Sequence, residues 1–484
     1  MITLLVSSPQ GLVARRSLLR FAAHFDYSAP EIRCDLRSPI TRLAQLLDMN
    51  PVDYVAVEGA ELPAPVWDEN KFMAGRLARP CHLQFWKELI LPTHPDMERL
   101  LEAMRGMKPQ RYFRRFRGRF AGVFYDCDSP PPRVFRNNFS TEPTSTGLDP
   151  EAWALSKILE DEATGAVIRL GKVGVVPPPR VVLPLSVEPA KPRLIHDARY
   201  TNLWCESRPF VMDRVGSVPE KFQQGAFMVS YDHKSGYHAF PFHADAREWF
   251  GFEIGGSYFV PAAGIFGWNC IPEIYNVSHD ALVDFARRVF GIPGMCYLDD
   301  VLSGSSWNVP RKGMEPSAGW AIELLLWLNF LAGYTISVKK SVLKPVQIIC
   351  WLGINIDSIL QIFSVPPAKK EIFMVLVRDA LRSGTVSIRN LERMAGKAVS
   401  FMLAVGEAAK VFTREMFNVL RDTRSRRSSK LLRVSARLKR VLHVWSKFLD
   451  TFDGAPWLRI MHSVLRIETD ASSRRWGGVL QDGD

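Results

Sequence analysis

Two adjacent carboxylates, Asp299 and Asp300, lie in the middle of an apolar stretch and constrain the fold of this chain more than any other feature. The stretch reads Met-Cys-Tyr-Leu-Asp-Asp-Val-Leu over residues 295–302, which predicts a strand, a tight turn and a second strand. Buried anions are costly unless they are paired or coordinate a metal, and carboxylate oxygens suit Mg²⁺. The alternative is an ordinary Asp-Asp turn, which the dipeptide alone does not exclude.

A third carboxylate, Asp232, follows an apolar strand candidate in the sequence Met-Val-Ser-Tyr-Asp-His-Lys-Ser-Gly-Tyr-His over residues 228–238. Three carboxylates at strand ends can hold two cations about 3.5–4 Å apart, which activate a hydroxyl and stabilise a leaving pyrophosphate during in-line phosphoryl transfer. The alternative is a hydrogen-bonded cap at the end of a strand. The sequence therefore offers a two-metal site as a hypothesis.

The overall charge is basic, with 62 Lys and Arg residues against 50 Asp and Glu residues and a formal charge of +12. An excess of this sign favours polyanionic partners through phosphate contacts, although many basic proteins bind nothing acidic. A hydrophobic content of 47% excludes a largely disordered chain. The length of 484 residues predicts several domains, since one domain usually takes about 100–200 residues.

The cysteines and the apolar segments bear on where the protein resides. The seven cysteines are scattered, and none forms a Cys-X-X-Cys pair, so neither a disulfide framework nor a zinc knuckle is predicted. The first residues lack the basic region of a signal peptide, and no uncharged apolar run reaches the length of a membrane span. We expect an intracellular protein, cytoplasmic or nuclear, with no membrane partner. Its oligomeric state stays open.

Further motifs accompany the carboxylates in one order along the chain. They lie at residues 191–202, 232–237, 266–272, 332–341 and 351–357. Tyr297-Leu-Asp-Asp300 resembles the Tyr-X-Asp-Asp signature of reverse transcriptases, and the other segments resemble the fingers, palm and primer-grip motifs of that family in family order. The resemblance covers about residues 165–484 and is greatest to the DIRS group of retrotransposons. It implies an RNA-directed DNA polymerase that adds dNTPs to a primer 3′-hydroxyl on an RNA or DNA template.

The resemblance also implies the catalytic residues. Asp232, Asp299 and Asp300 match the family's metal ligands, and the backbone carbonyl of His233 matches a further ligand. Two Mg²⁺ or Mn²⁺ ions are the implied cofactors. Lys340 matches a proposed general acid that protonates pyrophosphate.

A second group of matching residues implies a dNTP pocket. Arg193 corresponds to the fingers arginine that binds the triphosphate, and Lys191 lies close to it in sequence. Tyr237 corresponds to the steric gate, whose ring would collide with a ribose 2′-hydroxyl. Phe266 matches a neighbouring pocket position, and Gly267 matches a position where the backbone approaches the nascent base pair.

The predicted fold class is α+β, a right-hand polymerase with fingers, palm and thumb, a helical connection and an incomplete ribonuclease H-like C-terminus. The predicted parts are residues 1–90 of unknown role, 91–364 for fingers and palm, 365–455 for the helical thumb and connection, and 456–484 for the ribonuclease H-like segment. Asp470 in Ile-Glu-Thr-Asp-Ala-Ser matches the first metal ligand of ribonuclease H. Because that fold needs further carboxylates, we expect this segment to be truncated and without hydrolytic activity.

The alternation of apolar residues predicts individual elements. Strand candidates lie at residues 180–187, 226–230, 249–254, 257–261, 294–298, 334–338 and 348–356, and helix candidates lie at 272–290 and 320–331. We expect Gly333 to end the second helix with a left-handed cap. An amphipathic helix is predicted around residues 391–402, with Ser387 as its N-cap.

Two segments combine many cations. Residues 108–120 interleave arginines with aromatic residues, a pattern that fits either contact with nucleic acid or a basic outer face whose rings pack inward. Residues 421–440 are densely basic and fit either a nucleic-acid backbone or a solvated helix face.

Two readings from other classes remain beside the polymerase. An inactive retroelement remnant would bind primer–template but would not incorporate dNTPs. A purely structural protein would leave the ordered carboxylates and Tyr237 without explanation.

Overall fold

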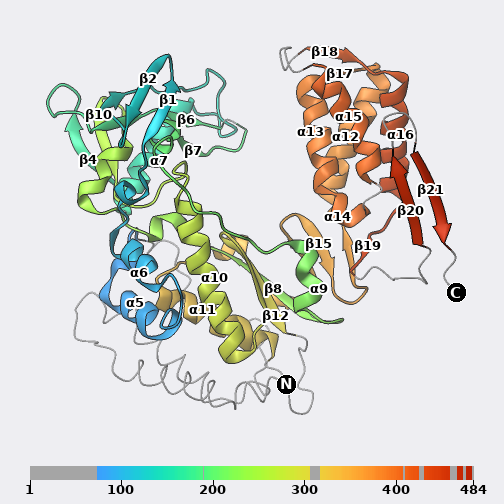
Figure 1. The fold of residues 1–484 in the computed structure, drawn as a ribbon, viewed down its shortest axis with the longest axis horizontal. Helices are drawn as coiled ribbons and strands as arrows, with labels where there is room; N and C mark the ends of the chain where they lie inside the picture. Colours follow the sequence, from blue (N-terminus) through green and yellow to red (C-terminus); the bar gives the residue numbers. More distant parts are fainter. Residues whose placement is uncertain are drawn as a thin grey trace. The chain divides into compact units, whose positions relative to one another are not determined.

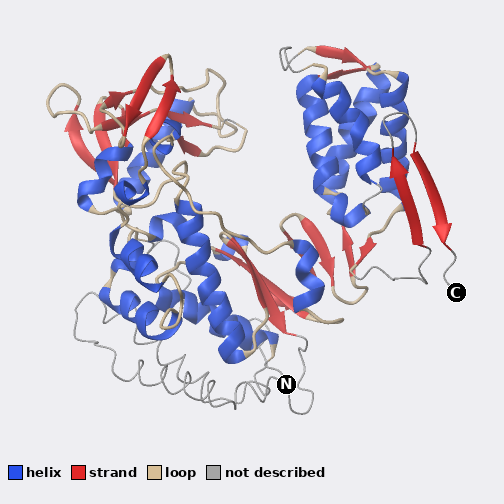
Figure 2. Cartoon of the chain, viewed as in Figure 1, coloured by secondary structure: helices blue, strands red, loops and turns tan. Residues whose placement is uncertain are grey.

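The structure is a computed structural model that describes residues 73–188, 190–305, 317–406, 409–423, 430–457, 466–471 and 476–481. The chain divides into two compact units, with the boundary between Leu352 and Gly353 (Figure 1). The first unit combines helices and sheets, and the second is mainly helical (Figure 2). This mixture agrees with the predicted α+β class.

A four-stranded antiparallel sheet forms the centre of the first unit. Its strands have the order β11-β12-β8-β13, and they are β8 (Phe227–Asp232), β11 (Gly294–Tyr297), β12 (Asp300–Ser305) and β13 (Val342–Val346). The helices α10 (Ile271–Phe290) and α11 (Ala318–Ala332) pack against this sheet. The sheet carries Asp232 and Asp300 at one end, which makes it the element that positions the candidate site.

Helix α11 is buried along its whole length, which explains its almost entirely apolar sequence. It begins at the N-cap Ser317, whose side chain accepts from Trp320 N, and ends at Gly333 with φ of 94°. The left-handed cap predicted at Gly333 is therefore confirmed. Residues 73–90 pack on this helix end: His82 Nδ1 donates to Leu331 O at 2.7 Å, and Trp86 Nε1 donates to Ala332 O at 2.8 Å.

A second sheet of five strands has the order β3-β5-β9-β10-β4, with parallel pairing only between β3 and β5 and between β5 and β9. Its strands are β3 (Arg133–Val134), β4 (Val167–Lys172), β5 (Val181–Leu183), β9 (Gly251–Ile254) and β10 (Ser257–Pro261). Helix α7 (Pro150–Ala163) covers it and forms a small core with buried Phe252 and Phe259.

Two hairpins and several short helices complete the first unit. The hairpins are β1 (Phe116–Phe120) with β2 (Val123–Cys127) and β6 (Leu185–Val187) with β7 (Leu194–His196). The remaining elements are η2 (Arg76–Ala78), α5 (Pro80–Phe85), η3 (Trp86–Ile90), α6 (Met97–Gly106), η4 (Pro109–Tyr112), α8 (Arg199–Asn202), η5 (Val215–Ser217), α9 (Val218–Lys221), η6 (Gly236–Ala239), η7 (Ala244–Phe250), η8 (Val338–Lys340) and β14 (Ile348–Trp351).

The second unit is built around a bundle of helices with its own apolar core. The helices are α12 (Pro367–Ser383), α13 (Ile388–Ser400), α14 (Met402–Val405), α15 (Ala409–Arg421) and α16 (Ala436–Thr451). The strands are β15 (Ile354–Asp357), β16 (Ile362–Ser364), β17 (Thr385–Ser387), β18 (Leu431–Arg433), β19 (Ala455–Pro456), β20 (Arg466–Ala471) and β21 (Trp476–Gln481). Ser387 Oγ accepts from Asn390 N at 3.2 Å, which confirms the predicted N-cap of α13.

Three predicted strands differ from the observed ones. Residues 334–338 form no strand. Ile336 makes a single bridge to His233, and the short helix η8 begins at Val338. Pro184 separates β5 from β6, because proline has no N–H for a ladder hydrogen bond. The stretch 348–356 is two strands, β14 and β15, since Leu352 (φ 46°) and Gly353 (φ 79°) reverse the chain between them.

Some predictions fall on residues outside the described ones. These are most of the N-terminal region, residues 1–72, and part of the basic segment, residues 424–429. Strands β20 and β21 pair antiparallel, and the side chain of Asp470, on which the predicted ribonuclease H-like role rests, lies outside the described part. In the described part of the chain, no helix has the length and apolar character needed to cross a membrane.

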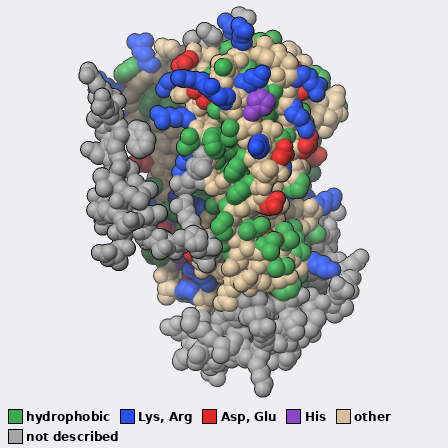
Figure 3. All heavy atoms as spheres, turned by 90° about the vertical axis from the view of Figure 1, so that its right-hand side faces the viewer, with side chains coloured by type: hydrophobic (Ala, Val, Ile, Leu, Met, Phe, Trp, Pro, Cys, Tyr) green, Lys and Arg blue, Asp and Glu red, His purple; other side chains and the backbone are tan. Residues whose placement is uncertain are grey.

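Most of the described cations of the two basic segments lie in solvent. Tyr112, Phe113, Phe116 and Phe120 are half-buried and pack against neighbouring rings, whereas the arginines at 114, 115, 117 and 119 are exposed. The inward-packing alternative is therefore the correct one for these four aromatic side chains. The cations of α16 lie on its solvent side, and one face of the molecule shows Lys and Arg side chains spread over its upper part (Figure 3).

Candidate active site

The strand register brings the predicted carboxylates to one end of the central sheet. In the antiparallel pairing of β12 with β8, Asp300 lies directly opposite Asp232. Asp299 precedes Asp300 in the two-residue turn between β11 and β12, and its carbonyl accepts from His233 N at 3.2 Å. Like charges directly opposite one another destabilise a sheet. This pairing of carboxylates therefore needs a compensating cation.

The turn that carries Asp299 is held by side chains of α10. Leu298, the other residue of the turn, has a φ of 53°, a conformation that costs energy for a residue with a Cβ. Its N–H donates to Asn276 Oδ1 at 3.0 Å, and its carbonyl accepts from His279 Nδ1 at 2.7 Å. Asn276 and His279 are both buried. The strained turn is thus fixed from outside the hairpin.

A buried polar network continues from His279 beneath the sheet end. The ring of His233 stacks on His279 with centroids 4.1 Å apart. His233 Nε2 lies 2.8 Å from Asn329 Oδ1, and Tyr275 Oη lies 2.5 Å from His233 Nδ1. Asn329 donates its own N–H to Leu325 O, which leaves its oxygen to accept from Nε2–H. His233 Nδ1 therefore accepts a hydrogen bond from the Tyr275 hydroxyl.

Burial keeps both histidines neutral. Desolvation lowers the pKa of His279 to about 4. For His233, desolvation and the nearby ring of His279 together lower the pKa well below its usual range. The His233 ring points into this network, so only its backbone is left to serve the predicted role as a metal ligand. That role stays a prediction.

One cation already lies at the carboxylates. Lys340 Nζ donates to Asp232 Oδ1 at 3.2 Å, and the Asp232 side chain is only 11% exposed whereas that of Lys340 is 66% exposed. Asp232 N donates to Ser341 Oγ at 3.1 Å. Burial and the neighbouring Asp299 and Asp232 raise the pKa of Asp300 to about 6, which Lys340 only partly offsets. The site therefore carries more negative charge than its own lysine neutralises.

The carboxylates fit divalent cations in chemistry but do not form a closed cage. In the described residues, no three Asp, Glu, His or Cys side chains form a group arranged to hold a metal ion. Mg²⁺ in polymerase sites is bound by one or two carboxylates, waters and substrate phosphates, and not by an all-protein cage. The carboxylates of Asp232 and Asp300 at one sheet end are donors of the kind that this mode of binding uses.

Tyr237 and Phe266 lie together beside the turn. Their ring centroids are 4.8 Å apart, and Tyr237 also contacts Tyr275 edge-on at 5.2 Å. Burial and the charge of Asp299 raise the pKa of Tyr237 to about 12, so its hydroxyl stays protonated at neutral pH. Phe266 is 53% exposed. The two predicted pocket residues therefore form one aromatic surface open to solvent.

Gly267 has a structural reason to be glycine. Its φ is 124°, and a Cβ there would lie 2.1 Å from the carbonyl oxygen of His196. Asn202 donates to Gly267 O at 2.8 Å and accepts from Asn269 N at 3.1 Å. These contacts join the predicted fingers motif to the predicted dNTP-side motif. They are sufficient to explain the glycine without a ligand.

Lys191 and Arg193 are not brought to the carboxylates by any contact. Both are exposed and lie in the connection between β6 and β7, where Arg193 O accepts from Glu188 N at 3.3 Å. Within the described residues neither side chain makes an ion pair. The structure places them on a hairpin tip with their charges free for an anionic ligand.

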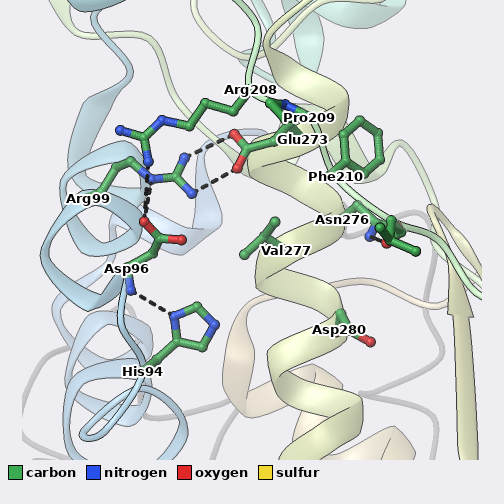
Figure 4. A pocket seen from close by; sticks show the side chains of 11 residues that line it. His94, Asp96, Arg99, Arg208, Pro209, Phe210, Glu273, Asn276, Val277 and Asp280 are labelled. Atoms are coloured by element: carbon green, nitrogen blue, oxygen red, sulfur yellow. Dashed lines mark hydrogen bonds and ion pairs between the residues drawn. The ribbon is translucent and has the colours of Figure 1, made fainter.

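Helix α10 is also fixed to α6 by a buried ion pair (Figure 4). Arg99 donates to both carboxylate oxygens of Glu273 at 2.9 and 2.8 Å, and to Asp96 Oδ1 at 3.1 Å. Arg208 also reaches Asp96, at 3.3 Å. A cavity of about 450 Å³ lies beside these groups. Helix α10 is thereby anchored to α6 through Glu273 and holds the turn at Leu298 and Asp299 through Asn276 and His279.

Asn276, His279 and Asn329 are the site residues that the sequence reasoning missed. Asn276 and His279 are spaced i, i+3 on the buried face of α10, where most of the other buried residues are apolar. Polar side chains at such positions need partners, since an unpaired buried polar group is costly. The i, i+3 spacing of these polar residues on a mostly apolar helix face could have identified them from the sequence. It does not predict which backbone groups they bind.

Comparison with known proteins supports the fold alone. No protein-family model and no curated protein matches this sequence. A foamy viral protease-reverse transcriptase, dRH, in complex with double-stranded DNA matches with a TM-score of 0.51 and 14% identity over 77% of this chain and 60% of that chain.

Two related solved structures agree with this match. The same type of enzyme with an RNA/DNA hybrid matches at a TM-score of 0.50 and 15% identity, over 77% of this chain and 46% of that one. A third structure, with double-stranded DNA, matches at a TM-score of 0.50 and 14% identity, over 83% of this chain and 78% of that one. The chain spans about three fifths of the first structure's length. It has a reverse transcriptase-like fold.

Proposed function

We propose that this chain is an RNA-directed DNA polymerase of a retroelement, similar to those of the DIRS group. The observation that carries the proposal is the register of β8 and β12, which sets Asp232 directly opposite Asp300 beside the braced turn at Asp299. A cluster of acidic side chains at a sheet end would be destabilising without a functional cation. The reverse transcriptase-like fold agrees with this assignment.

Asp232, Asp299 and Asp300 would hold two Mg²⁺ or Mn²⁺ ions, with the His233 carbonyl as a further ligand. Such ions lower the pKa of the primer 3′-hydroxyl and neutralise charge on the leaving group. The 3′-oxygen would lose its proton to water and form a bond to the α-phosphorus of a dNTP, while the bond from that phosphorus to pyrophosphate would break. Lys340, exposed beside Asp232, would give a proton to the departing pyrophosphate.

The aromatic surface beside Asp299 would select the sugar. Tyr237 is held between Phe266 and Tyr275, so its ring cannot move far to admit a ribose 2′-hydroxyl. Arg193 and Lys191 would bind the triphosphate, because a guanidinium and an ammonium on an exposed hairpin tip suit an anionic ligand. Gly267 and Phe266 would border the nascent base pair.

The proposed partners are dNTPs and a primer annealed to an RNA or DNA template. The matched solved structures hold double-stranded DNA or an RNA/DNA hybrid, and the net charge of +12 suits such a polyanion. The helical second unit would act as the thumb that follows the nucleic-acid backbone.

One observation favours a second candidate, a protein that binds primer–template without extending it. Lys340 occupies one oxygen of Asp232, and the described side chains form no ready metal group. If Lys340 kept this position with substrate bound, it would exclude a metal from Asp232. The two candidates differ in whether dNTPs are incorporated.

Primer extension on an RNA template with dNTPs and Mg²⁺, repeated with Mn²⁺, separates them. We expect the intact chain to extend the primer, and Asp299→Asn and Asp300→Asn each to lower the rate on the order of 1000-fold, since several kcal/mol of transition-state stabilisation depend on the metal. Asp245→Asn is the matched control, because that side chain is 81% exposed and lies outside the motif segments. Tight binding without extension by the intact chain would instead establish the binding protein.

A further inference from the structure

The β1–β2 hairpin has one face packed on the first unit and one face in solvent. The antiparallel register places Arg117 opposite Asp126 and Arg119 opposite Phe124, so these four side chains share a face. The intervening positions, including Phe116 and Tyr125, point the other way. The two faces therefore differ completely in their surroundings.

The packed face fixes the base of the hairpin. Trp204 contacts Phe116 with ring centroids 5.1 Å apart and Tyr125 at 5.5 Å, and its Nε1 donates to Cys127 O at 2.9 Å. Tyr125 is 7% exposed. Because these contacts immobilise the inner face, the outer face is presented in a defined orientation.

The tip of the hairpin is open. Ala121 (φ 47°) and Gly122 (φ 81°) form its two-residue turn, and both have positive φ, as in a type I′ turn. A Cβ added to Gly122 would meet no atom within 4 Å. Nothing in the described part of the chain covers this end, so a ligand can approach the outer face along the full length of the hairpin.

The outer face combines free cations with an exposed ring. The side chains of Arg115 and Arg117 are 66% and 78% exposed and share the single carboxylate of Asp126. Arg119 is exposed and pairs with no acidic residue among those described. Phe124, directly across from Arg119, is 54% exposed. Asp126 thus faces three guanidinium groups, with Asp128 also acting on Arg115, and the aromatic ring beside them is more than half exposed.

We propose that this outer face binds single-stranded nucleic acid, with Phe124 stacking on a base and Arg117 and Arg119 contacting phosphates. Cations that follow a backbone, combined with a ring on which a base can stack, are the features that bind single strands without sequence preference. A duplex does not fit the ring as well, because its bases are already stacked on one another and would have to be parted. An acidic protein would satisfy the arginines but not the ring.

The proposal rests on the proposed function only for the identity of the strand, which would be the unpaired template. The binding itself needs neither dNTPs nor a metal. Residues 108–120 drew attention in the sequence for their aromatic side chains, but the ring in solvent is Phe124, on the return strand.

The test is the affinity of the full chain for a fluorescent single-stranded RNA of about 20 nucleotides, long enough for one binding groove. Anisotropy is measured in EDTA without dNTPs for the intact chain, Phe124→Ser and Arg119→Gln. Val175→Ser, at a position 80% exposed, and Arg105→Gln, an exposed arginine of α6, are the controls. A blunt duplex is titrated in parallel, and thermal unfolding checks that each variant is folded.

We expect Phe124→Ser to weaken single-strand binding about tenfold, the loss that follows when one stacked base is removed. Arg119→Gln should weaken it less and lower the salt dependence, because one phosphate contact disappears. Duplex binding should change no more than in the controls. Equal single-strand affinities for Phe124→Ser and Val175→Ser, or an equal loss on the duplex, would overturn the proposal. A chain that extends no primer yet shows the selective loss would contradict the polymerase and leave this surface established.

Discussion

The hairpins β11–β12 and β1–β2 each have a two-residue turn, but the first turn is held by buried side chains and the second lies in solvent. Each turns through two residues, one of which is a non-glycine residue with positive φ: Leu298 at 53° and Ala121 at 47°. Both polar backbone groups of Leu298 are bound by buried side chains of α10. Ala121 and Gly122 lie exposed at an open tip.

The difference shows how one local motif can serve two purposes. The turn that carries Asp299 is fixed from outside by Asn276 and His279, and under the proposed function this precision matters, since a small misplacement of a reacting group costs much of the rate. A surface that meets a flexible strand needs only a rigid base. Substitutions of α10 residues that hold or anchor this turn should therefore reduce stability or activity. Substitutions on the exposed face of the β1–β2 hairpin should not affect the fold.

The largest effect on stability is expected at the ion pair that anchors α10 to α6. Glu273→Gln should lower the free energy of unfolding by about 3 kcal/mol, because it leaves the guanidinium of Arg99 without its buried partner. Thermal or denaturant unfolding measures this loss. Glu371→Gln is the control, since that carboxylate is 63% exposed in its pair with Arg378 and should cost about 0–1 kcal/mol. Equal losses in the two variants would show that α10 is not anchored by this pair.

Removing the contacts to the turn should reduce catalysis more than binding. Asn276→Ala and His279→Leu should each lower kcat for primer extension about 10- to 100-fold with a small change in KM for dNTPs, since Leu298 loses a partner and the turn moves. Steady-state kinetics separates the two constants.

Ser278→Ala is the control for these variants, because Ser278 is buried on the same helix but donates to Ile274 O within it. Its kcat should stay near that of the intact chain. If Asn276→Ala and His279→Leu behaved like Ser278→Ala, the turn would not depend on α10.

A smaller effect is expected from the titration of Asp300. Its pKa is raised to about 6 by burial and by Asp299 and Asp232, whereas in the unfolded chain it is near 3.8. The folded state therefore binds the proton more tightly, and stability falls as pH rises from about 4 to 6 and stays low above that range. In EDTA at about pH 7.5, Asp300→Asn should be more stable than the intact chain by about 1 kcal/mol, a figure discounted for partial exposure.

The comparison of stabilities is repeated at about pH 4. There Asp300 in the folded protein is neutral, like the asparagine that replaces it, so the stability gained by Asp300→Asn should vanish. An advantage that does not change with pH would mean that charge repulsion across β8 and β12 is not its cause.

The smallest effect should come from the open hairpin. Phe124→Ser should change the free energy of unfolding by no more than about 0.5 kcal/mol, since the ring is 54% exposed. The neighbouring Tyr125→Ser should cost about 3 kcal/mol, because that ring is buried against Trp204. Denaturant unfolding of the pair would show whether the two faces differ as described, and similar costs would contradict it.

Local chemistry made several parts of this protein predictable. The helix predicted at 272–290 is α10, displaced by one residue at its start, because apolar periodicity and a proline at the first turn mark it. Gly333 and Ser387 cap helices as expected. The strand, turn and strand around Asp299 follow from apolar residues on both sides of a short polar connection.

Other features could not be read from the chain. Alternation along residues 116–127 predicts two faces but not which face is covered, so the packed rings and the exposed Phe124 were not distinguished. The expected strand at 334–338 is replaced by a bridge and a turn, since its neighbours along the sheet were unknown. The buried carboxylate of Glu273 has its partner on α6, far away in sequence.

The sequence by itself determined that three carboxylates would stand at strand ends or turns, because each is surrounded by residues whose local preferences are clear. Only the tertiary structure decided that Asp232 lies opposite Asp300, that Lys340 reaches Asp232 and that Asn276 and His279 hold Leu298. The physical reason is that local preferences depend on neighbours within a few residues. Register and side-chain contacts depend on which distant surfaces bury one another, and that is settled only when the whole core packs.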